Sequence, residues 1–246
     1  VKFGHGAFMT NEASGRKLAE ALVAISTSMG KPTSALLTRM DQPLGRMVGN
    51  SLEVIEAIDS LRGNGPDDLM EVTYALGAEM LILGGLHTTR TEAKESLEAA
   101  IISGAALDAF RELVDAQGGN SIIIDDVSHL PRSNQTKEIN LENNKPLYVV
   151  SVDAKEFGAA ACLLGAGRMN ADSIVDPTVG LELLKKIGDR VETREEVVRI
   201  HYQDTRLLVQ AEARLKKAIQ LSEKKPERLP LIIDHICAPD PKNKRT

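Results

Sequence analysis

The sequence contains no tryptophan and few other aromatic residues, and this scarcity limits the partners that it can recognise. Aromatic residues make up 3% of the 246 positions. Proteins that hold single-stranded nucleic acid stack its bases on aromatic side chains, so this composition argues against such a role. A formal net charge of -5 argues the same way, because proteins that bind nucleic acid are typically basic. The one basic run, Lys242 to Arg245, is predicted to be a solvated tail, and we expect no nucleic-acid partner.

Cysteine is also scarce, and long hydrophobic runs are missing. Cys162 and Cys237 lie far apart in the sequence, which does not resemble a disulfide or zinc framework. No apolar run approaches the ~18 residues of a membrane span, and no signal peptide is visible. We therefore expect a cytoplasmic protein without a membrane partner. The histidines show no HExxH spacing, so a metal site built on them is not expected. The sequence has no P-loop or nucleophile elbow, and no organic cofactor is expected.

The first part of the chain alternates strand and helix patterns. Residues 1–3 and 33–38 are predicted to be strands, and a helix is predicted over residues 12–29, with Leu18, Leu22 and Ile25 on one face. A second helix is predicted to start at or just after Leu44, because Pro43 disfavours helix at the residue before it. This order of elements is typical of an α/β fold with a mixed, mostly parallel sheet and flanking helices.

The later part of the chain has a different pattern of predicted elements. Helices are predicted over residues 153–164 and 205–222, between short strands, and the segment LPLIIDHI, residues 229–236, is predicted to be the last strand. We interpret residues 1–130 as an α/β domain and residues 131–246 as a smaller α+β unit.

Two groups of residues could carry chemistry. The turn Gly4-His5-Gly6 could hold an anion on its backbone N–H groups, but a lone Gly-x-Gly is weak evidence, and a structural turn with an exposed, inert His5 is the preferred interpretation. Glu53 and Glu56 lie one helical turn apart and could ligate a cation or act as an acid/base pair. Taken alone, the pattern favours solvated carboxylates on a helix face.

Several motifs together resemble a known family. VKFGHGAFM, MDQPLGRMVGNSLEVIEAI, SGAALDAF, DAQGG and IGDRVETREEVVRIH follow one another in the order found in the thymidine phosphorylase and pyrimidine nucleoside phosphorylase family. The resemblance covers nearly the whole chain. It implies that the carboxy-terminal unit resembles a barrel-sandwich fold of the biotinyl/lipoyl type. In the hairpin of that unit, Arg194 or Glu195 stands where a glycine is usual.

The resemblance also implies a reaction. Members of this family catalyse phosphorolysis, and the first interpretation is a thymidine phosphorylase that converts thymidine and phosphate to thymine and 2-deoxyribose 1-phosphate. The alternatives are a broader pyrimidine nucleoside phosphorylase, a purine- or AMP-type relative, and a non-catalytic fragment that acts as a scaffold or interaction module. The family's phosphate loop and its base-binding Arg, Ser and Lys are expected upstream of Val1. Residues 1–246 alone are therefore expected to be inactive, and a homodimer is expected to form through the upstream helical region.

The resemblance assigns few site residues to this segment, and none of them is catalytic. Phe8 matches the position that lines the pyrimidine pocket near C5, although without the family a buried core phenylalanine would be preferred. The backbone carbonyls of Leu44 and Met47 and the side chain of Glu56 match the ligands of a potassium-like ion, for which oxygen ligands are suitable. Lys2 matches the family's strand lysine and is given no catalytic role.

Overall fold

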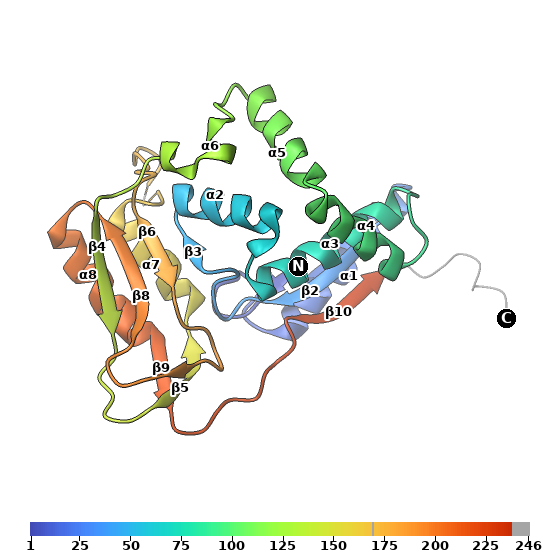
Figure 1. The fold of residues 1–246 in the computed structure, drawn as a ribbon. Helices are drawn as coiled ribbons and strands as arrows, with labels where there is room; N and C mark the ends of the chain where they lie inside the picture. The colour runs from blue at the N-terminus through green and yellow to red at the C-terminus, as the bar shows by residue number, and fades with distance from the viewer. Residues whose placement is uncertain (169, 238–246) are drawn as a thin grey trace.

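A computed structural model describes residues 1–168 and 170–237, and the basic run from Lys242 lies outside these residues. Figure 1 shows two sheet-containing regions at opposite sides of a group of helices. The α-helices are α1 Glu12–Ser28, α2 Asn50–Asp59, α3 Asp67–Leu83, α4 Arg90–Ile102, α5 Ala105–Ala116, α6 Ile122–Asp125, α7 Ala154–Leu164 and α8 Thr205–Ala218. A π-helical turn, Ser60–Asn64, follows α2, and a 3-10 turn, Val127–His129, follows α6.

The first sheet combines strands from both ends of the chain. Its order is β1-β2-β10, formed by Lys2–Phe3, Ser34–Arg39 and Ile232–Cys237. β1 runs parallel to β2, whereas β10 runs antiparallel to it, and Ile236 faces Ala35 across this pair. The α/β fold class is thus confirmed, and the sheet is mixed. The division of the chain at residue 130 stays a prediction, but β10 lies in the sheet of the first unit.

Helix α1 packs on this sheet through its small residues. Gly15, Ala19 and Val23 are buried, whereas the stripe of Leu18, Leu22 and Ile25 faces outward. A Cβ at Gly15 would lie 3.0 Å from a methyl group of Leu37, so glycine allows the helix backbone to approach the sheet closely. The predicted bounds of this helix are confirmed, but its larger apolar side chains are not those that pack on the sheet.

The carboxy-terminal part contains two further sheets. The four-stranded sheet has the order β3-β6-β8-β4, and the three-stranded sheet has the order β7-β5-β9, with antiparallel pairing throughout the described strands. They do not close into a barrel in the described part of the chain. The strands are β3 Met47–Val48, β4 Gln135–Asn140, β5 Leu147–Val152, β6 Gly180–Leu183, β7 Arg190–Val191, β8 Glu196–Tyr202 and β9 Ile219–Ser222.

Helices α7 and α8 complete the core of this part of the molecule. Side chains from both helices and from the two sheets form one buried cluster, in which Phe157, Leu181 and Leu215 are fully inaccessible. The predicted helix 205–222 is four residues too long, because α8 ends at Ala218 and residues 219–222 form β9 instead. Ile219 pairs with Val152 and is buried, so burial and strand pairing outweigh the helical pattern of the sequence.

The prediction that a helix starts near Leu44 is wrong. Residues Met47–Val48 form β3, and α2 begins at Asn50. Gly45 and Gly49 have φ angles of +69° and +142°, which are not helical and which glycine adopts without strain. The segment therefore changes direction twice before the helix begins, and β3 joins the four-stranded sheet opposite Glu182 and Leu181.

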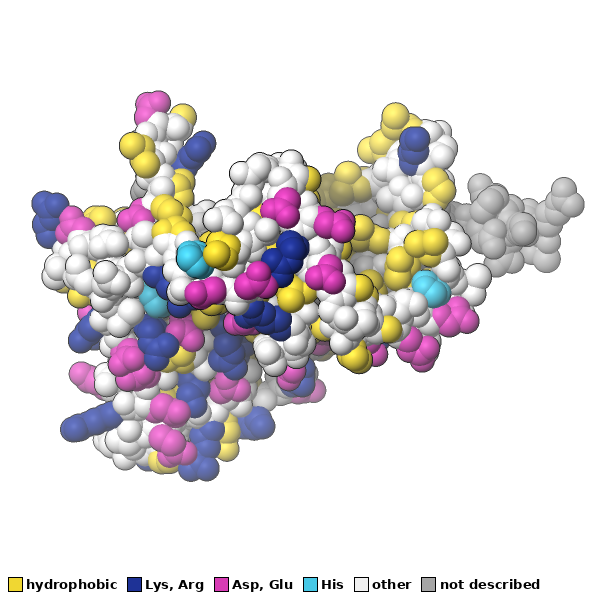
Figure 2. Space-filling model, turned by 45° about the horizontal axis from the view of Figure 1, so that its top comes forward, with side chains coloured by type: hydrophobic (Ala, Val, Ile, Leu, Met, Phe, Trp, Pro, Cys, Tyr) yellow, Lys and Arg dark blue, Asp and Glu magenta, His cyan; other side chains and the backbone are white. Residues whose placement is uncertain are grey.

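The surface differs between the two parts of the molecule. Figure 2 shows both signs of charge interspersed over the carboxy-terminal sheets and hydrophobic side chains gathered toward the helices. Helices α3 to α5 and the residues next to them expose several large apolar side chains: Leu76, Met80, Leu83, Leu86, Ile102 and Leu113. Within residues 1–168 and 170–237, no helix is long and apolar enough to cross a membrane.

Candidate substrate and cation site

The Gly4-His5-Gly6 turn is held by hydrogen bonds that its backbone N–H groups donate. The N–H of Gly4 donates to the carbonyl of Met9, that of His5 to Asp41 Oδ1, and that of Gly6 to the carbonyl of Met40, over 2.9, 3.3 and 2.9 Å. The N–H of the next residue donates to the carbonyl of Gly4. These N–H groups have partners within the protein, so the turn is structural and does not form an anion cradle. His5 is exposed, as expected.

The turn determines the position of Phe8. A Cβ at Gly4 would lie 2.5 Å from Asp41 Oδ1, so the close approach of the turn to Asp41 needs glycine at this position. Two residues after the turn, the side chain of Phe8 is fully exposed. The interpretation of Phe8 as a core residue is therefore wrong. An exposed phenylalanine on a fixed turn is available to contact a substrate or another part of the protein.

Glu56 is buried, in contrast to the preferred interpretation as a solvated carboxylate. Its side chain is 9% exposed and reaches back from α2 toward the segment before β3. Oε1 accepts the backbone N–H of Arg46 over 2.7 Å, and Oε2 is 3.4 Å from the nitrogen of Met47. A Cβ at Gly45 would lie 2.3 Å from Oε2, so only glycine lets the carboxylate approach the chain here.

The Glu56 carboxyl lies in an environment that disfavours its charged form. Burial raises the pKa of this carboxyl above its ordinary value, although hydrogen bonds from the backbone of Arg46 and Met47 and the nearby charge of Lys186 act in the opposite direction. A bound cation would stabilise the charged carboxylate where water is displaced. Glu53 is arranged differently, because it accepts the N–H of Gly49 at the start of α2. The two glutamates therefore do not act as a pair.

The backbone of Met47 is oriented toward Glu56. Leu183 N donates to Arg46 O over 2.7 Å, whereas the N–H of Arg46 donates to Glu56 Oε1. Met47 faces Glu182 as the next pair, so its N–H and C=O both point away from β6. Since this N–H points to Glu56, the carbonyl lies on the same side of the strand. The structure thus brings the Glu56 carboxylate together with the backbone N–H groups of Arg46 and Met47, and the cation site stays a prediction.

Two charged residues that the sequence analysis missed lie beside this group. Lys186 Nζ donates to the carbonyl of Pro43 over 3.0 Å and forms an ion pair with Asp68. Asp68 also accepts the N–H of Gly45. The lysine side chain is 12% exposed, and burial lowers its pKa although the Asp68 carboxylate opposes this effect. The Lys185-Lys186 dipeptide does not indicate which of its two side chains is buried.

The carboxy-terminal unit holds the segment that contains Pro43. Gln42 Oε1 accepts the N–H of Ile187 over 3.0 Å, and the guanidinium of Arg46 donates to the carbonyl of Leu184 over 2.7 Å. These contacts join residues about 140 positions apart. The geometry of the candidate cation site therefore depends on both parts of the molecule. In the part of the chain that the structure describes, no three His, Cys, Asp or Glu side chains gather as a metal-binding group.

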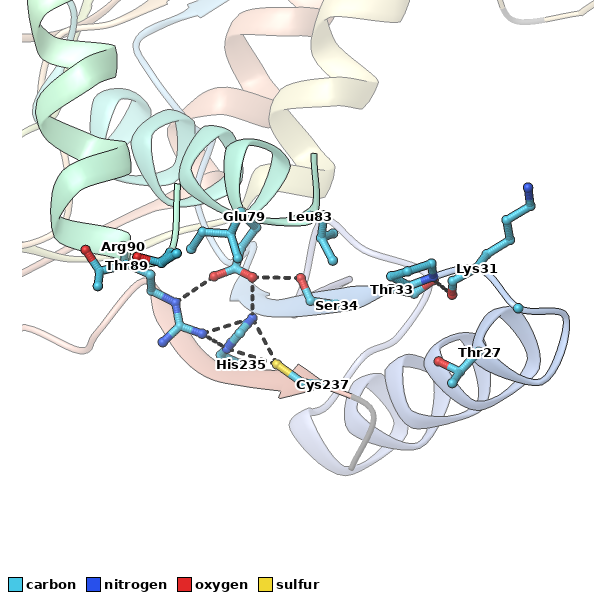
Figure 3. Close-up of a pocket in the computed structure, with 14 residues that line it drawn as sticks. Thr27, Lys31, Thr33, Ser34, Glu79, Leu83, Thr89, Arg90, His235 and Cys237 are labelled. Carbon is cyan, nitrogen blue, oxygen red and sulfur yellow. Dashed lines mark hydrogen bonds and ion pairs between the residues drawn. The ribbon is translucent and has the colours of Figure 1, made fainter. Parts of the chain in front are cut away.

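A cavity of about 770 Å³ lies elsewhere, at the edge of the first sheet. Figure 3 shows Glu79 at its wall, where the carboxylate accepts Arg90 Nε over 2.6 Å and Ser34 Oγ over 2.9 Å and lies 2.8 Å from His235 Nε2. These contacts join α3 and the start of α4 to β2 and β10. The cavity is lined by neither Phe8 nor Glu56, so we interpret the Glu79 group as a structural connection.

Comparisons with known proteins place the chain in a family. Residues 1–107 match the model described as "Glycosyl transferase family, a/b domain", and residues 148–222 match the "Pyrimidine nucleoside phosphorylase C-terminal domain". The pyrimidine-nucleoside phosphorylases of Bacillus subtilis (strain 168) and Staphylococcus aureus (strain USA300) are each 42% identical to it over 201 residues, 82% of this chain. The chain belongs to the thymidine/pyrimidine nucleoside phosphorylase family. It spans 46% of the length of these two relatives.

The residues of the candidate site are divided between the two matched regions. Phe8 and Glu56 lie in the matched a/b domain, whereas Lys186 lies in the matched phosphorylase C-terminal domain. The ion pair between Lys186 and Asp68 therefore joins the two matched regions. The roles of Phe8, Leu44, Met47 and Glu56 in substrate or ion binding stay predictions.

Proposed function

We propose that the protein containing this chain catalyses the phosphorolysis of pyrimidine nucleosides, with thymidine as the first candidate substrate and uridine as the second. The observation that carries the proposal is the 42% identity to pyrimidine-nucleoside phosphorylases, together with matches to both regions of the family. The class of enzyme is a pentosyltransferase. Homodimer formation, expected from the resemblance, and a cytoplasmic location, expected from the sequence, stay predictions.

In this reaction an oxygen of inorganic phosphate forms a bond to C1′ of the nucleoside as the bond from C1′ to the base nitrogen breaks. The base leaves with the electron pair and takes up a proton, and the pentose 1-phosphate is the other product. Positive charge develops on the sugar in the transition state, so the enzyme must hold the phosphate and the base on opposite faces of the ring. We assign none of these catalytic tasks to residues 1–246.

We propose that this chain contributes one wall of the base pocket and one cation site. Phe8 would supply an apolar surface near C5 of the pyrimidine, which suits the methyl group of thymine. Leu44, Met47 and Glu56 would supply oxygen ligands to a potassium-like ion, which supplies a positive charge and ties together the segments that bind it. The chain's own part is to hold Glu56 beside Arg46 and Met47 with the correct orientation.

The proposal is tested by measuring release of thymine and uracil from thymidine and uridine in phosphate buffer. The full-length protein should release a free base only when phosphate is present, and the ratio of kcat/KM for the two nucleosides decides the preferred substrate. Residues 1–246 alone should release no base above the buffer control. Absence of release by the full-length protein with both nucleosides would support the scaffold alternative, and release from purine nucleosides would support the purine-type alternative.

A further inference from the structure

The loop that carries Phe8 is closed on itself at Gly4. The N–H of Gly4 donates to the carbonyl of Met9 over 2.9 Å, and the carbonyl of Gly4 accepts the N–H of Ala7 over 3.1 Å. Phe8 lies between Ala7 and Met9, so both of its neighbours are hydrogen-bonded to the same residue. The position of the exposed Phe8 side chain therefore depends on where Gly4 and its turn are held.

The turn is held by the two residues that follow β2. The N–H of Gly6 donates to the carbonyl of Met40 over 2.9 Å, and the N–H of His5 donates to Asp41 Oδ1 over 3.3 Å. Both bonds lie at the carboxyl ends of the parallel strands β1 and β2, which is the edge where α/β sheets bind ligands. The bond to Asp41 is made by a side chain, so a substitution can remove it.

The Asp41 carboxylate is itself oriented by Arg39. Nη1 of Arg39 lies 3.3 Å from Asp41 Oδ2, which leaves Oδ1 to accept the N–H of His5. The Arg39 guanidinium lies over the ring of the buried Phe3, 5.1 Å from the ring centroid, and this contact restricts its position. The carboxylate thus has one oxygen for the turn and one for a cation that is held on the sheet.

The backbone of Asp41 is held by the carboxy-terminal unit. Its carbonyl accepts the N–H of Ala154, the first residue of α7, over 2.9 Å. The side chain of Asp153 caps this end of the helix and fixes its start. Ala154 also limits the turn sterically, because a Cβ at Gly6 would lie 2.7 Å from the Cβ of Ala154. Asp41 and the turn are therefore both in contact with the start of α7.

We propose that Asp41 is a positioning residue for the nucleoside: its carboxylate fixes the turn that presents Phe8, and its backbone joins this turn to the carboxy-terminal unit. The inference rests on the proposed role of Phe8 in the base pocket. It gives the carboxy-terminal unit a part in binding the nucleoside, through the contacts of Ala154. Because Asp41 acts through an apolar contact of Phe8, and such contacts weaken steeply with distance, its loss should affect the nucleoside and not phosphate.

The test is steady-state kinetics of the full-length protein with its preferred nucleoside and phosphate varied in turn. Asp41→Ala should raise the KM for the nucleoside by at least about fivefold and leave the KM for phosphate within about twofold of wild type. Asp41→Asn keeps an oxygen that accepts the N–H of His5 and should stay within about twofold of wild type in both constants. Asp59→Ala, a matched control, removes a carboxylate that pairs with Arg62 away from the turn, and it should match wild type.

A double-mutant cycle separates positioning from a general structural effect. In the Phe8→Ala background, Asp41→Ala should change the KM for the nucleoside by less than about twofold, because the side chain that it positions is already gone. Full additivity of the two substitutions would show that Asp41 does not act through Phe8 and would overturn the proposal.

A compensating pair covers the case in which Asp41→Ala does not fold. Gly6→Ala should displace the turn from α7 and raise the KM for the nucleoside by at least about fivefold. The double variant Gly6→Ala with Ala154→Gly removes the opposing methyl group and should return this KM to within about threefold of wild type. An unchanged KM for the nucleoside in the variants that fold would overturn the positioning role and leave the proposed activity standing. A wild type that releases no base would overturn the activity, and the role of Asp41 with it.

Discussion

Glu56 Oε1 lies 2.7 Å from the backbone nitrogen of Arg46, so a carboxylate on α2 is held against the chain ten residues before it. If this carboxylate ligates a cation, Glu56→Gln should abolish the stabilisation that potassium gives to the folded protein, because an ion bound only to the folded state stabilises it by mass action. Melting curves of the full-length protein in potassium and in choline, at equal ionic strength, measure the difference.

Glu53→Gln is the control for this experiment. It removes a carboxylate from the same helix, one turn away, whose partner is the N–H of Gly49. Its potassium response should match that of wild type, although the neutral amide oxygen of glutamine accepts the Gly49 N–H more weakly, which lowers the free energy of unfolding by at most about 1 kcal/mol. An identical potassium response in Glu56→Gln and wild type would remove Glu56 from the cation site.

Glu79 gives a prediction about acid stability. Burial alone would raise the pKa of this carboxyl, but hydrogen bonds from Arg90 and Ser34 and the charge of His235 outweigh it, so the pKa lies below its ordinary value. A carboxyl with a depressed pKa in the folded state stabilises the protein above its unfolded pKa, and this stability is lost as the pH falls through the folded value. The free energy of unfolding should therefore fall as the pH decreases below about 4.5.

Glu79→Gln should remove that part of the pH dependence and cost about 1–3 kcal/mol at neutral pH, because Arg90 and His235 lose a charged partner. Urea unfolding at a series of pH values measures both effects. Glu71→Gln changes an exposed residue on the same helix and should remain within about 0.5 kcal/mol of wild type. If Glu79→Gln and wild type lose stability in parallel as the pH falls, the Glu79 group does not contribute to acid unfolding.

The course of the chain around Leu44 illustrates what the sequence could and could not predict. The sequence predicted a helix after Pro43, and α2 is present. Its start was predicted too early, because the glycines at 45 and 49 were not given the positive φ angles that they adopt. These angles depend on the approach of Glu56 and of β6, which are contacts between distant residues that a local pattern does not contain.

The sequence likewise predicted some features of the candidate site and missed others. The motifs located Phe8 and Glu56, and the resemblance gave them roles, but neither source indicated that Glu56 is buried. Lys186 could not be distinguished from Lys185, since the two are identical residues at adjacent positions. Only the pairing of β3 with β6 brings Lys186 to Pro43 and Asp68. The pairing of β10 with β2 could not be predicted either, because it joins segments far apart in the sequence.

Arg194 provides a prediction in the opposite direction, toward higher stability. It has a φ of +60°, in the left-handed region that glycine adopts more readily, and it stands in the hairpin where the resemblance placed an unusual residue at 194 or 195. Arg194→Gly should raise the free energy of unfolding by about 1 kcal/mol. The backbone N–H of this residue donates to Asn143 Oδ1 over 3.3 Å, and glycine retains that bond. Urea unfolding of the variant beside Glu195→Gly, which has no such φ angle to relieve, measures the gain, and a loss of stability in Arg194→Gly would contradict the argument.

Phe8 links the structure to the proposed reaction. Because its side chain is fully exposed, Phe8→Ala should change the free energy of unfolding by less than about 0.5 kcal/mol. If Phe8 lines the base pocket, the same variant of the full-length protein should weaken nucleoside binding by about 1–3 kcal/mol, the value of an apolar contact, and should leave the KM for phosphate nearly unchanged. Steady-state kinetics with each substrate varied in turn separate the two effects.

His5→Ala, in the adjoining turn, is the control and should match wild type in the KM for the nucleoside and in the KM for phosphate. Equal losses for nucleoside and phosphate in Phe8→Ala would show that Phe8 does not select the base.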